Sequence, residues 1–196
     1  MKTTNFFVIL ALIASSFVYT SCDTKKVVED DTAVNVPVPD FSVNIQTTVE
    51  VTTPEPEEVE ELRSENLLNY FEGEATLDIN EKDFKNLKNN KELILWHTLK
   101  IGAVNVLVDC STGDYAENVS FSVAGVGSLN IQKCVFGVTY TSTELSTFAA
   151  KIFVEFVKRG LITVHAEGYT DAEAGGDITI SLSFKGVEVK AKIVQF

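Results

Sequence analysis

Short runs in which apolar and polar residues alternate recur along most of the chain, and they limit the fold more than any other feature. The clearest runs cover residues 41–51, 178–184 and 187–193. A period of two residues is that of a β-strand with one buried and one exposed face, so each run predicts a half-buried strand. Strands at such spacing are typical of a sandwich or barrel. Further apolar runs of strand length cover residues 93–99, 103–109, 118–124, 128–140 and 161–169.

The two C-terminal runs are separated only by Lys185 and Gly186. A gap of two residues that ends in glycine is typical of a tight β-hairpin. We therefore predict that the two runs fold back on each other, with Phe184 opposite Val187. This register keeps the apolar side chains of both strands on one face.

One segment, residues 144–159, has the period of a helix instead. Ser142 or Thr143 can cap its start, and Gly160 follows its end. The predicted fold class is mainly β, an antiparallel, sandwich-like domain with one long amphipathic helix packed on it. An α+β domain, in which the helix covers an antiparallel sheet, is the alternative. The apolar positions of the segment recur at intervals of three and four: Leu145, Phe148, Ala149, Ile152, Phe153, Phe156 and Val157.

The stretch before residue 93 combines weaker patterns. Acidic side chains crowd the start of residues 57–71, where a helix dipole favours negative charge, so we predict a second helix there, ended by Gly73. Alternation over residues 75–79 predicts a short strand. Residues 81–88 are interpreted as a polar turn or a single helical stretch.

The first 22 residues have the order of an export signal. Lys2 precedes an apolar run over residues 6–14, and small residues follow it up to Ser21. The run is much shorter than the ~20 apolar residues that a transmembrane helix needs. We therefore predict a cleaved signal peptide over residues 1–21.

The segment Tyr19-Thr20-Ser21-Cys22 resembles the lipobox of bacterial lipoproteins, in the looser form of Bacteroidota-type lipoproteins with serine before the cysteine. The resemblance implies that Cys22 carries fatty acyl chains such as palmitate and begins the mature chain. The expected location is then the outer membrane or the cell surface, with the membrane as partner through the anchor. Secretion, with Cys22 a plain thiol, is the alternative. Asp31-Thr32-Ala33 resembles the O-glycosylation site of the same group, which implies a glycan on Thr32; a bare linker is the alternative.

The distribution of charge and proline predicts two parts in the exported chain. The whole chain has a net charge of −12, and residues 23–65 hold 12 acidic and 3 basic residues. We expect an acidic, proline-containing tether over residues 22–40 and one β-rich globular domain over residues 41–196. Nucleic acid would need a basic face, which this distribution does not favour.

Few residues are candidates for chemistry. Cys110 and Cys134 form a disulfide in one interpretation and two separate buried thiols in the other. His97 and His165 lie in different strand runs without a metal-binding spacing, so no metal site and no cofactor are expected.

One loop gathers oxygen ligands. Asp171, Glu173 and Asp177 lie in a glycine-containing segment and are a candidate cation loop, because calcium accepts carboxylates from flexible loops. A solvated loop between strands is the alternative.

The sequence contains no recognisable catalytic constellation, so the expected function is a non-enzymatic binding or structural module. Its partner would be a protein or a glycan, and Tyr115 and Tyr169 are the stacking platforms that a glycan would need. A carrier of an apolar ligand, in a cavity beneath the helix 144–159, is the second hypothesis. An enzyme is the third, and it requires a histidine to meet Cys110 or a carboxylate in a cleft.

Overall fold

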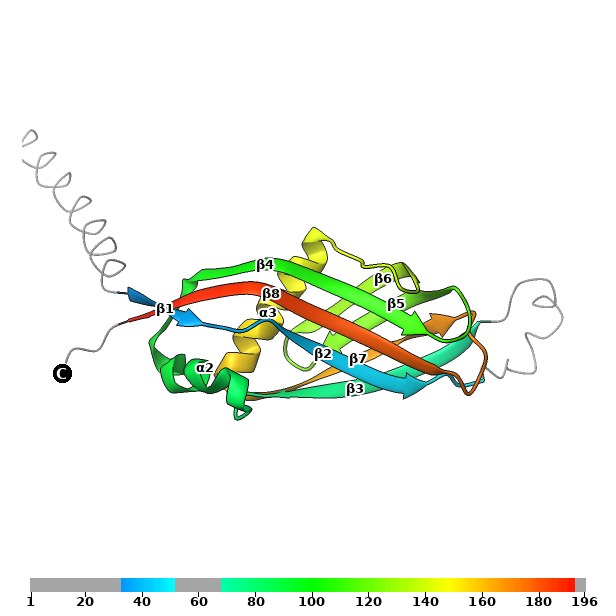
Figure 1. The fold of residues 1–196 in the computed structure, drawn as a ribbon, viewed down its shortest axis with the longest axis horizontal. Helices are drawn as coiled ribbons and strands as arrows, with labels where there is room; N and C mark the ends of the chain where they lie inside the picture. The colour runs from blue at the N-terminus through cyan, green and yellow to red at the C-terminus, as the bar shows by residue number, and fades with distance from the viewer. Residues whose placement is uncertain (1–32, 52–67, 193–196) are drawn as a thin grey trace, which may run out of the picture.

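Two antiparallel four-stranded sheets make up the fold of the computed structural model, which describes residues 33–51 and 68–192 (Figure 1). The mainly β fold class is thereby confirmed. Within these residues, no helix is both long and apolar enough to cross a membrane. Sheet A contains β1 (Ala33–Pro37), β2 (Phe41–Thr48), β4 (Ile94–Cys110) and β8 (Asp177–Lys192); sheet B contains β3 (Asn69–Asp78), β5 (Tyr115–Val123), β6 (Gly127–Val135) and β7 (Leu161–Thr170), in the order β3-β7-β5-β6.

Strand β8 runs through the middle of sheet A. It pairs with β4 on one side, and with β2 and then β1 on the other. Figure 1 shows it as one long red ribbon between these neighbours. The sheets meet where Glu50 and Tyr70 form a bridge with two backbone hydrogen bonds of 2.7 and 3.1 Å.

The predicted C-terminal hairpin is wrong, because β8 is a single strand. Lys185 and Gly186 are both exposed, while Phe184 before them and Val187 after them are buried. Strand β8 nevertheless pairs with β4 in one unbroken register here, since Val104 lies opposite Phe184 and Ile101 opposite Val187. Gly186 has φ of +59°, and its N–H donates to the Asp40 carboxylate at 2.8 Å.

Three other predicted boundaries are corrected by strand pairing. Strand β1 lies inside the predicted tether of residues 22–40, because Ala33–Pro37 pairs with β8 and buries Val36. The two predicted strands 93–99 and 103–109 are one strand, β4. Asn69, Tyr70 and Phe71 belong to β3 and not to a helix; residues 57–67 of the predicted helix lie outside the described residues.

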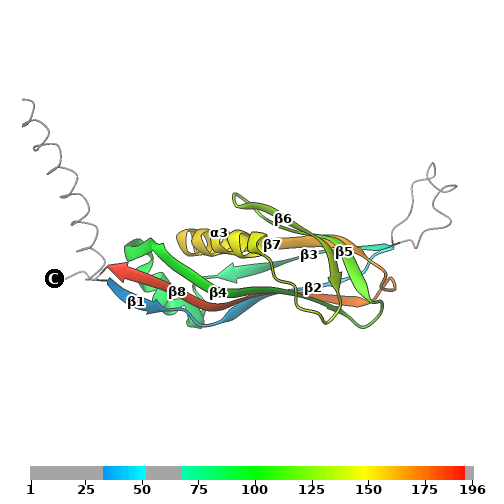
Figure 2. The ribbon, with the colours of Figure 1, turned by 90° about the horizontal axis from the view of Figure 1, so that it is seen from above.

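The predicted long helix is confirmed as α3 (Thr143–Arg159). The Ser142 hydroxyl accepts a hydrogen bond from the Leu145 N–H at 3.0 Å, and Gly160 ends the helix with φ of +82°. Figure 2 shows α3 at the level of β7, above β4 and β8, so the helix continues the layer of sheet B over sheet A. The predicted polar turn or helical stretch of residues 81–88 consists of η2 (Lys82–Phe84) and the start of α2 (Lys85–Asn90), which the short η3 (Lys91–Leu93) follows.

Phenylalanine rings join α3 to sheet A. The Phe41 and Phe184 rings stack at 4.6 Å between centroids, and the Phe84 and Phe156 rings meet edge to face at 4.9 Å. Phe153 lies 6.4 Å from Phe41 in the same cluster. Aromatic pairs of this geometry contribute about 0.5–1.5 kcal/mol each beyond the area that they bury. The helix is therefore an integral part of the core.

Candidate functional site

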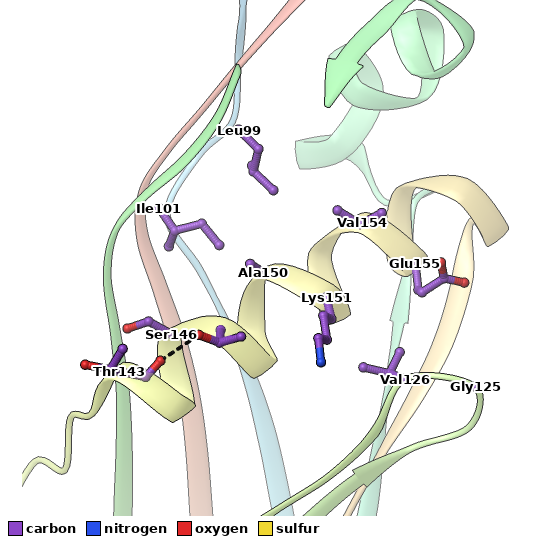
Figure 3. A pocket seen from close by; sticks show the side chains of 11 residues that line it. Leu99, Ile101, Gly125, Val126, Thr143, Ser146, Ala150, Lys151, Val154 and Glu155 are labelled. Atoms are coloured by element: carbon purple, nitrogen blue, oxygen red, sulfur yellow. Dashed lines mark hydrogen bonds between the residues drawn. The ribbon is translucent and has the colours of Figure 1, made fainter. Parts of the chain in front are cut away.

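A groove of about 640 Å³ lies along the outer side of α3, in the size range of small-molecule sites (Figure 3). We call it the α3 groove. Its walls are α3, strand β4 and the turn between β5 and β6. Its apolar lining consists of Leu99, Ile101, Val126, Ala150 and Val154, and its polar lining includes Thr143, Ser146, Thr147, Lys151 and Glu155.

The β4 wall depends on an irregularity in the strand. Leu95 pairs with Lys190 and Lys100 pairs with Glu188, so four residues of β4 stand opposite Val189 alone. The Thr98 hydroxyl holds this bulge, since it accepts from the Lys190 N–H at 2.9 Å and donates to the Leu95 carbonyl at 2.7 Å. Bulges re-aim side chains, and Figure 3 shows the side chain of Leu99 projecting from β4 on the side of α3.

The opposite wall is a turn that α3 fixes. Gly125 has φ of +79°, and a Cβ there would collide with the Arg159 guanidinium. Arg159 donates to the Ala124 carbonyl at 2.7 Å and pairs with Glu155 at 3.0 Å. These contacts place Val126 at the edge of the groove.

The charges at the groove are unequal. Glu155 is matched by Arg159 and also by Lys158, at 3.3 Å. Lys151 is exposed and has no acidic partner within 4 Å in the described part of the chain. The groove therefore offers an apolar wall beside one uncompensated positive charge.

The groove is not the cavity that the carrier hypothesis required. Phe148, Ile152 and Phe156 point into the core with 6, 0 and 0% of their surface exposed. The space beneath α3 is filled by phenylalanine rings, and the groove opens on the opposite side of the helix. An apolar ligand would therefore bind outside the helix rather than under it.

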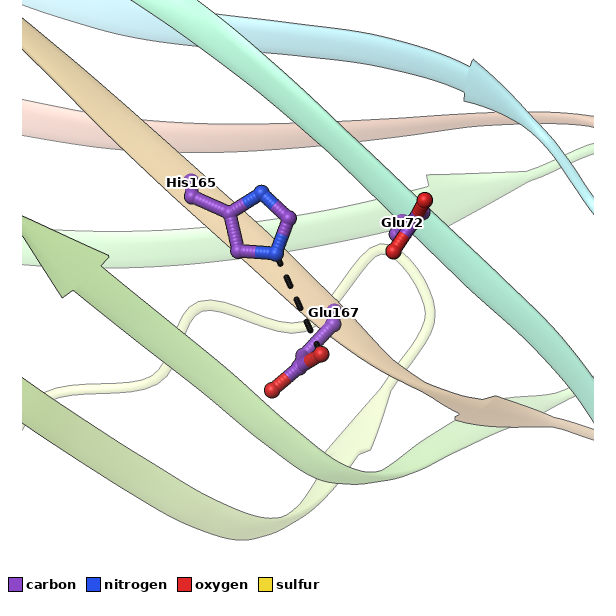
Figure 4. A group of neighbouring side chains, drawn as sticks. All are labelled: Glu72, His165 and Glu167. Atoms are coloured by element: carbon purple, nitrogen blue, oxygen red, sulfur yellow. Dashed lines mark ion pairs between the residues drawn. The ribbon is translucent and has the colours of Figure 1, made fainter.

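A second cluster lies on the outer face of sheet B and joins Glu72, His165 and Glu167 (Figure 4). Their ligand atoms lie within 4.8 Å of one another, and the His165 Nε2 is 3.9 Å from a Glu167 oxygen. The Tyr70 hydroxyl donates toward both carboxylates, at 2.9 Å to Glu72 and 3.1 Å to Glu167. Burial raises the pKa of Tyr70, and the two carboxylates raise it further.

The sequence anticipated only part of this cluster. His165 was considered as a ligand only together with His97, which lies on β4 in the other sheet. Glu72 was placed between a predicted helix and a predicted strand, and its pairing with Glu167 requires the register of β3 against β7. The alternation of His165 and Glu167 on one strand face was the available signal.

Cys110 and Cys134 are both free thiols in the structure. Cys134 is buried on β6, and burial raises the pKa of its thiol to about 11. Cys110 is partly buried at the end of β4, and its sulfur lies 3.8 Å from the Thr112 hydroxyl. Neither the groove nor the cluster on sheet B contains a cysteine.

Asp171, the first acidic residue of the predicted cation loop, has a structural role. One oxygen of Asp171 accepts hydrogen bonds from the Asp114 and Tyr115 N–H groups at 2.9 and 3.0 Å, which ties the loop to the start of β5. Asp177 begins β8 opposite Thr48. Among the described residues, the three loop acids do not converge as a set of metal ligands; the set that does is the one on sheet B.

The remaining predicted site residues are two tyrosines on the surface of sheet B and two residues near the N-terminus. Tyr169 is 41% exposed and meets Tyr70 at 5.6 Å between ring centroids. Tyr115 has the Lys133 ammonium 3.6 Å above its ring, so a cation already occupies that stacking face. Cys22 and Thr32 lie outside the described residues.

The fold and the groove define a two-sheet β protein with a helix-lined surface site. No family model matches the chain, and searches of curated proteins and of solved structures found no similar protein. Its function is therefore argued from the site.

Proposed function

We propose that the protein is a membrane-anchored, non-enzymatic binding module that holds a small apolar ligand with an anionic group in the α3 groove. The observation that carries the proposal is the combination of an apolar wall with Lys151, the one groove residue whose charge lacks a partner among the described residues. Ligand sites are commonly apolar concavities with a few polar groups that set orientation. The anionic group would lie at Lys151, and the apolar part against Leu99, Val126 and Val154.

The anchor belongs to the same proposal. Acyl chains on Cys22 would hold the module at the outer membrane or the cell surface, since two or more chains give durable binding where one alone is marginal. The intact mass of the protein from its native membrane tests this part. A mass equal to residues 22–196 plus acyl groups supports it, whereas a chain that lacks residues 1–21 and carries no lipid refutes the anchor.

Dye binding tests the groove directly. The chain from Asp23 onward keeps every described residue, and circular dichroism can establish that it is folded. Anilinonaphthalene sulfonate, a small apolar anion, should bind with a rise in fluorescence. Ala150→Trp should abolish the rise because the larger side chain fills the groove. Thr163→Trp, on the outer face of β7, is the matched control and should bind the dye normally.

Competition tests the charge. Dodecanoate should displace the dye at lower concentration than dodecyltrimethylammonium, which has the same chain length and the opposite charge. Lys151→Glu should reverse that order. Unchanged dye binding in Ala150→Trp would refute the groove as the site, and equal displacement by the two amphiphiles would refute the preference for an anion.

A further inference from the structure

The arrangement of Glu72, His165 and Glu167 is fixed by strand pairing. Glu72 on β3 lies directly opposite Glu167 on β7, and His165 is two residues before Glu167, so all three project from the outer face of sheet B. Side chains on paired strands hold their spacing through the backbone ladder, unlike side chains on a loop. Figure 4 shows the three side chains together over the two strands.

The charge of this cluster is uncompensated. Two carboxylates directly opposite each other on paired strands destabilise a sheet. Glu117, on the same face, is matched by Lys133 at 3.5 Å. In the described part of the chain, neither Glu72 nor Glu167 has a lysine or arginine within 4 Å. The His165 ring lies 3.9 Å from Glu167 and is charged only when it is protonated.

We propose that Glu72, His165 and Glu167 bind one divalent transition-metal ion of the zinc class. Zinc binds histidine nitrogen and carboxylate oxygen, and its open sites have three protein ligands with a fourth position left for water. Calcium and magnesium prefer all-oxygen sites, so the histidine selects against them. A metal ion would remove the repulsion between the two carboxylates and use the histidine in its neutral form.

Tyr70 has a positioning role in this site. Its hydroxyl lies within hydrogen-bond distance of one oxygen of each carboxylate and can donate its single proton to either, which holds the two carboxylates beside His165. Hydrogen bonds of this kind orient metal ligands, and their loss typically weakens metal binding about 10–100-fold. The ligand atoms lie within 4.8 Å of one another, so side-chain rotation alone can bring them to the ~2.0–2.2 Å bonds of zinc.

Calorimetric titration of zinc into the full chain, purified in a non-ionic detergent and stripped with a chelator, tests the proposal. His165→Gln and Glu72→Gln should each weaken the site at least about tenfold, and Tyr70→Phe should weaken it to a smaller or similar extent. Glu117→Gln is the control, because Glu117 is an acid on the same face but not a ligand. The zinc affinity of this variant should stay within about twofold of that of the unmodified chain. Thermal unfolding without metal shows whether each variant is folded.

Cobalt binding gives a second, spectroscopic measurement that is independent of the calorimetric signal. Cobalt bound in four-coordinate geometry should produce visible absorption bands in the unmodified chain and lose them in His165→Gln. Zinc affinity equal in His165→Gln and in the unmodified chain would overturn the proposal, since the ion would then be bound elsewhere, for example by a thiol. The absence of any saturable zinc binding would also overturn it, as would calcium binding as tight as zinc.

Discussion

Replacement of Phe156 by alanine measures whether α3 is packed into the core or lies over a cavity. The Phe156 ring has no exposed surface, meets Phe84 edge to face at 4.9 Å and lies 6.4 Å from Phe41. Phenylalanine-to-alanine changes in filled cores cost about 3–5 kcal/mol, because the transfer free energy is lost and a cavity remains. Loss of the edge-to-face pair is part of that figure, at about 0.5–1.5 kcal/mol.

We therefore expect Phe156→Ala to lower the free energy of unfolding by about 4 kcal/mol, a large share of the 5–15 kcal/mol typical of a domain. Val154→Ala is the matched control, because Val154 lies on the same helix but lines the groove and is only partly buried. It should cost about 1 kcal/mol or less. Urea unfolding of the chain from Asp23 onward, followed by circular dichroism, gives both values.

Equal costs for the two substitutions would refute this description of the core. If α3 covered an open cavity, Phe156 would have few partners to lose, and its truncation would cost about as little as that of Val154. Stronger binding of anilinonaphthalene sulfonate in Phe156→Ala without loss of stability would have the same meaning. A cost near 4 kcal/mol leaves the groove outside the helix as the site for an apolar ligand.

The packing and the thiols lead to four further predictions. Gly73→Ala should destabilise the fold by about 1–3 kcal/mol in urea unfolding, because the new Cβ would lie 2.8 Å from the Ile45 side chain. Gly186→Ala should cost about 1–2 kcal/mol in the same assay, since φ is +59° there. Burial raises the pKa of Cys134 from 9.0 to about 11, so the thiol ionises at lower pH in the unfolded chain than in the folded one. The free energy of unfolding should therefore fall by up to about 3 kcal/mol as pH rises from 9 to 11. The fall should be smaller in Cys134→Ala. A small thiol reagent should label Cys110 before Cys134; equal rates would contradict the burial difference.

Sequence patterns predicted correctly those helices and strands whose structure depends on residues within the same short segment. Helix α3 was predicted to within one residue because its apolar stripe, its Ser142 cap and its terminal Gly160 all lie within one stretch of chain. The mainly β class followed in the same way from the alternation in β2 and β8 and from the apolar runs of β5 and β7. Such patterns need no knowledge of distant partners.

The errors arose where distant partners decide the structure. Two alternating runs separated by Lys185 and Gly186 have the same local pattern in a hairpin and in one continuous strand with a glycine at positive φ. Strand β8 is continuous because β4 is long enough to pair with both halves, and because β1 and β2 divide the opposite side between them. None of these strands is close to β8 in sequence, so the local pattern could not distinguish the two structures.

The candidate sites were hidden for the same reason, but α3 contains a signal for one of them. Besides its buried stripe, the helix has small or apolar side chains at Thr143, Thr147, Ala150 and Val154, spaced by three or four residues. A second stripe of small side chains on a helix allows another element to approach, or leaves room beside it. Here the bulge of β4 supplies that other element and leaves a groove between them.

The two sites occupy different elements, which makes the two proposals separable. The groove is formed by α3, β4 and the β5–β6 turn, whereas the metal ligands come from β3 and β7. Substitutions at sites without shared partners usually act independently. Ala150→Trp should therefore leave zinc affinity unchanged, and His165→Gln should leave dye binding unchanged. If His165→Gln altered dye binding, the ion would have to act on the groove through β7, which contacts α3 as well as β3.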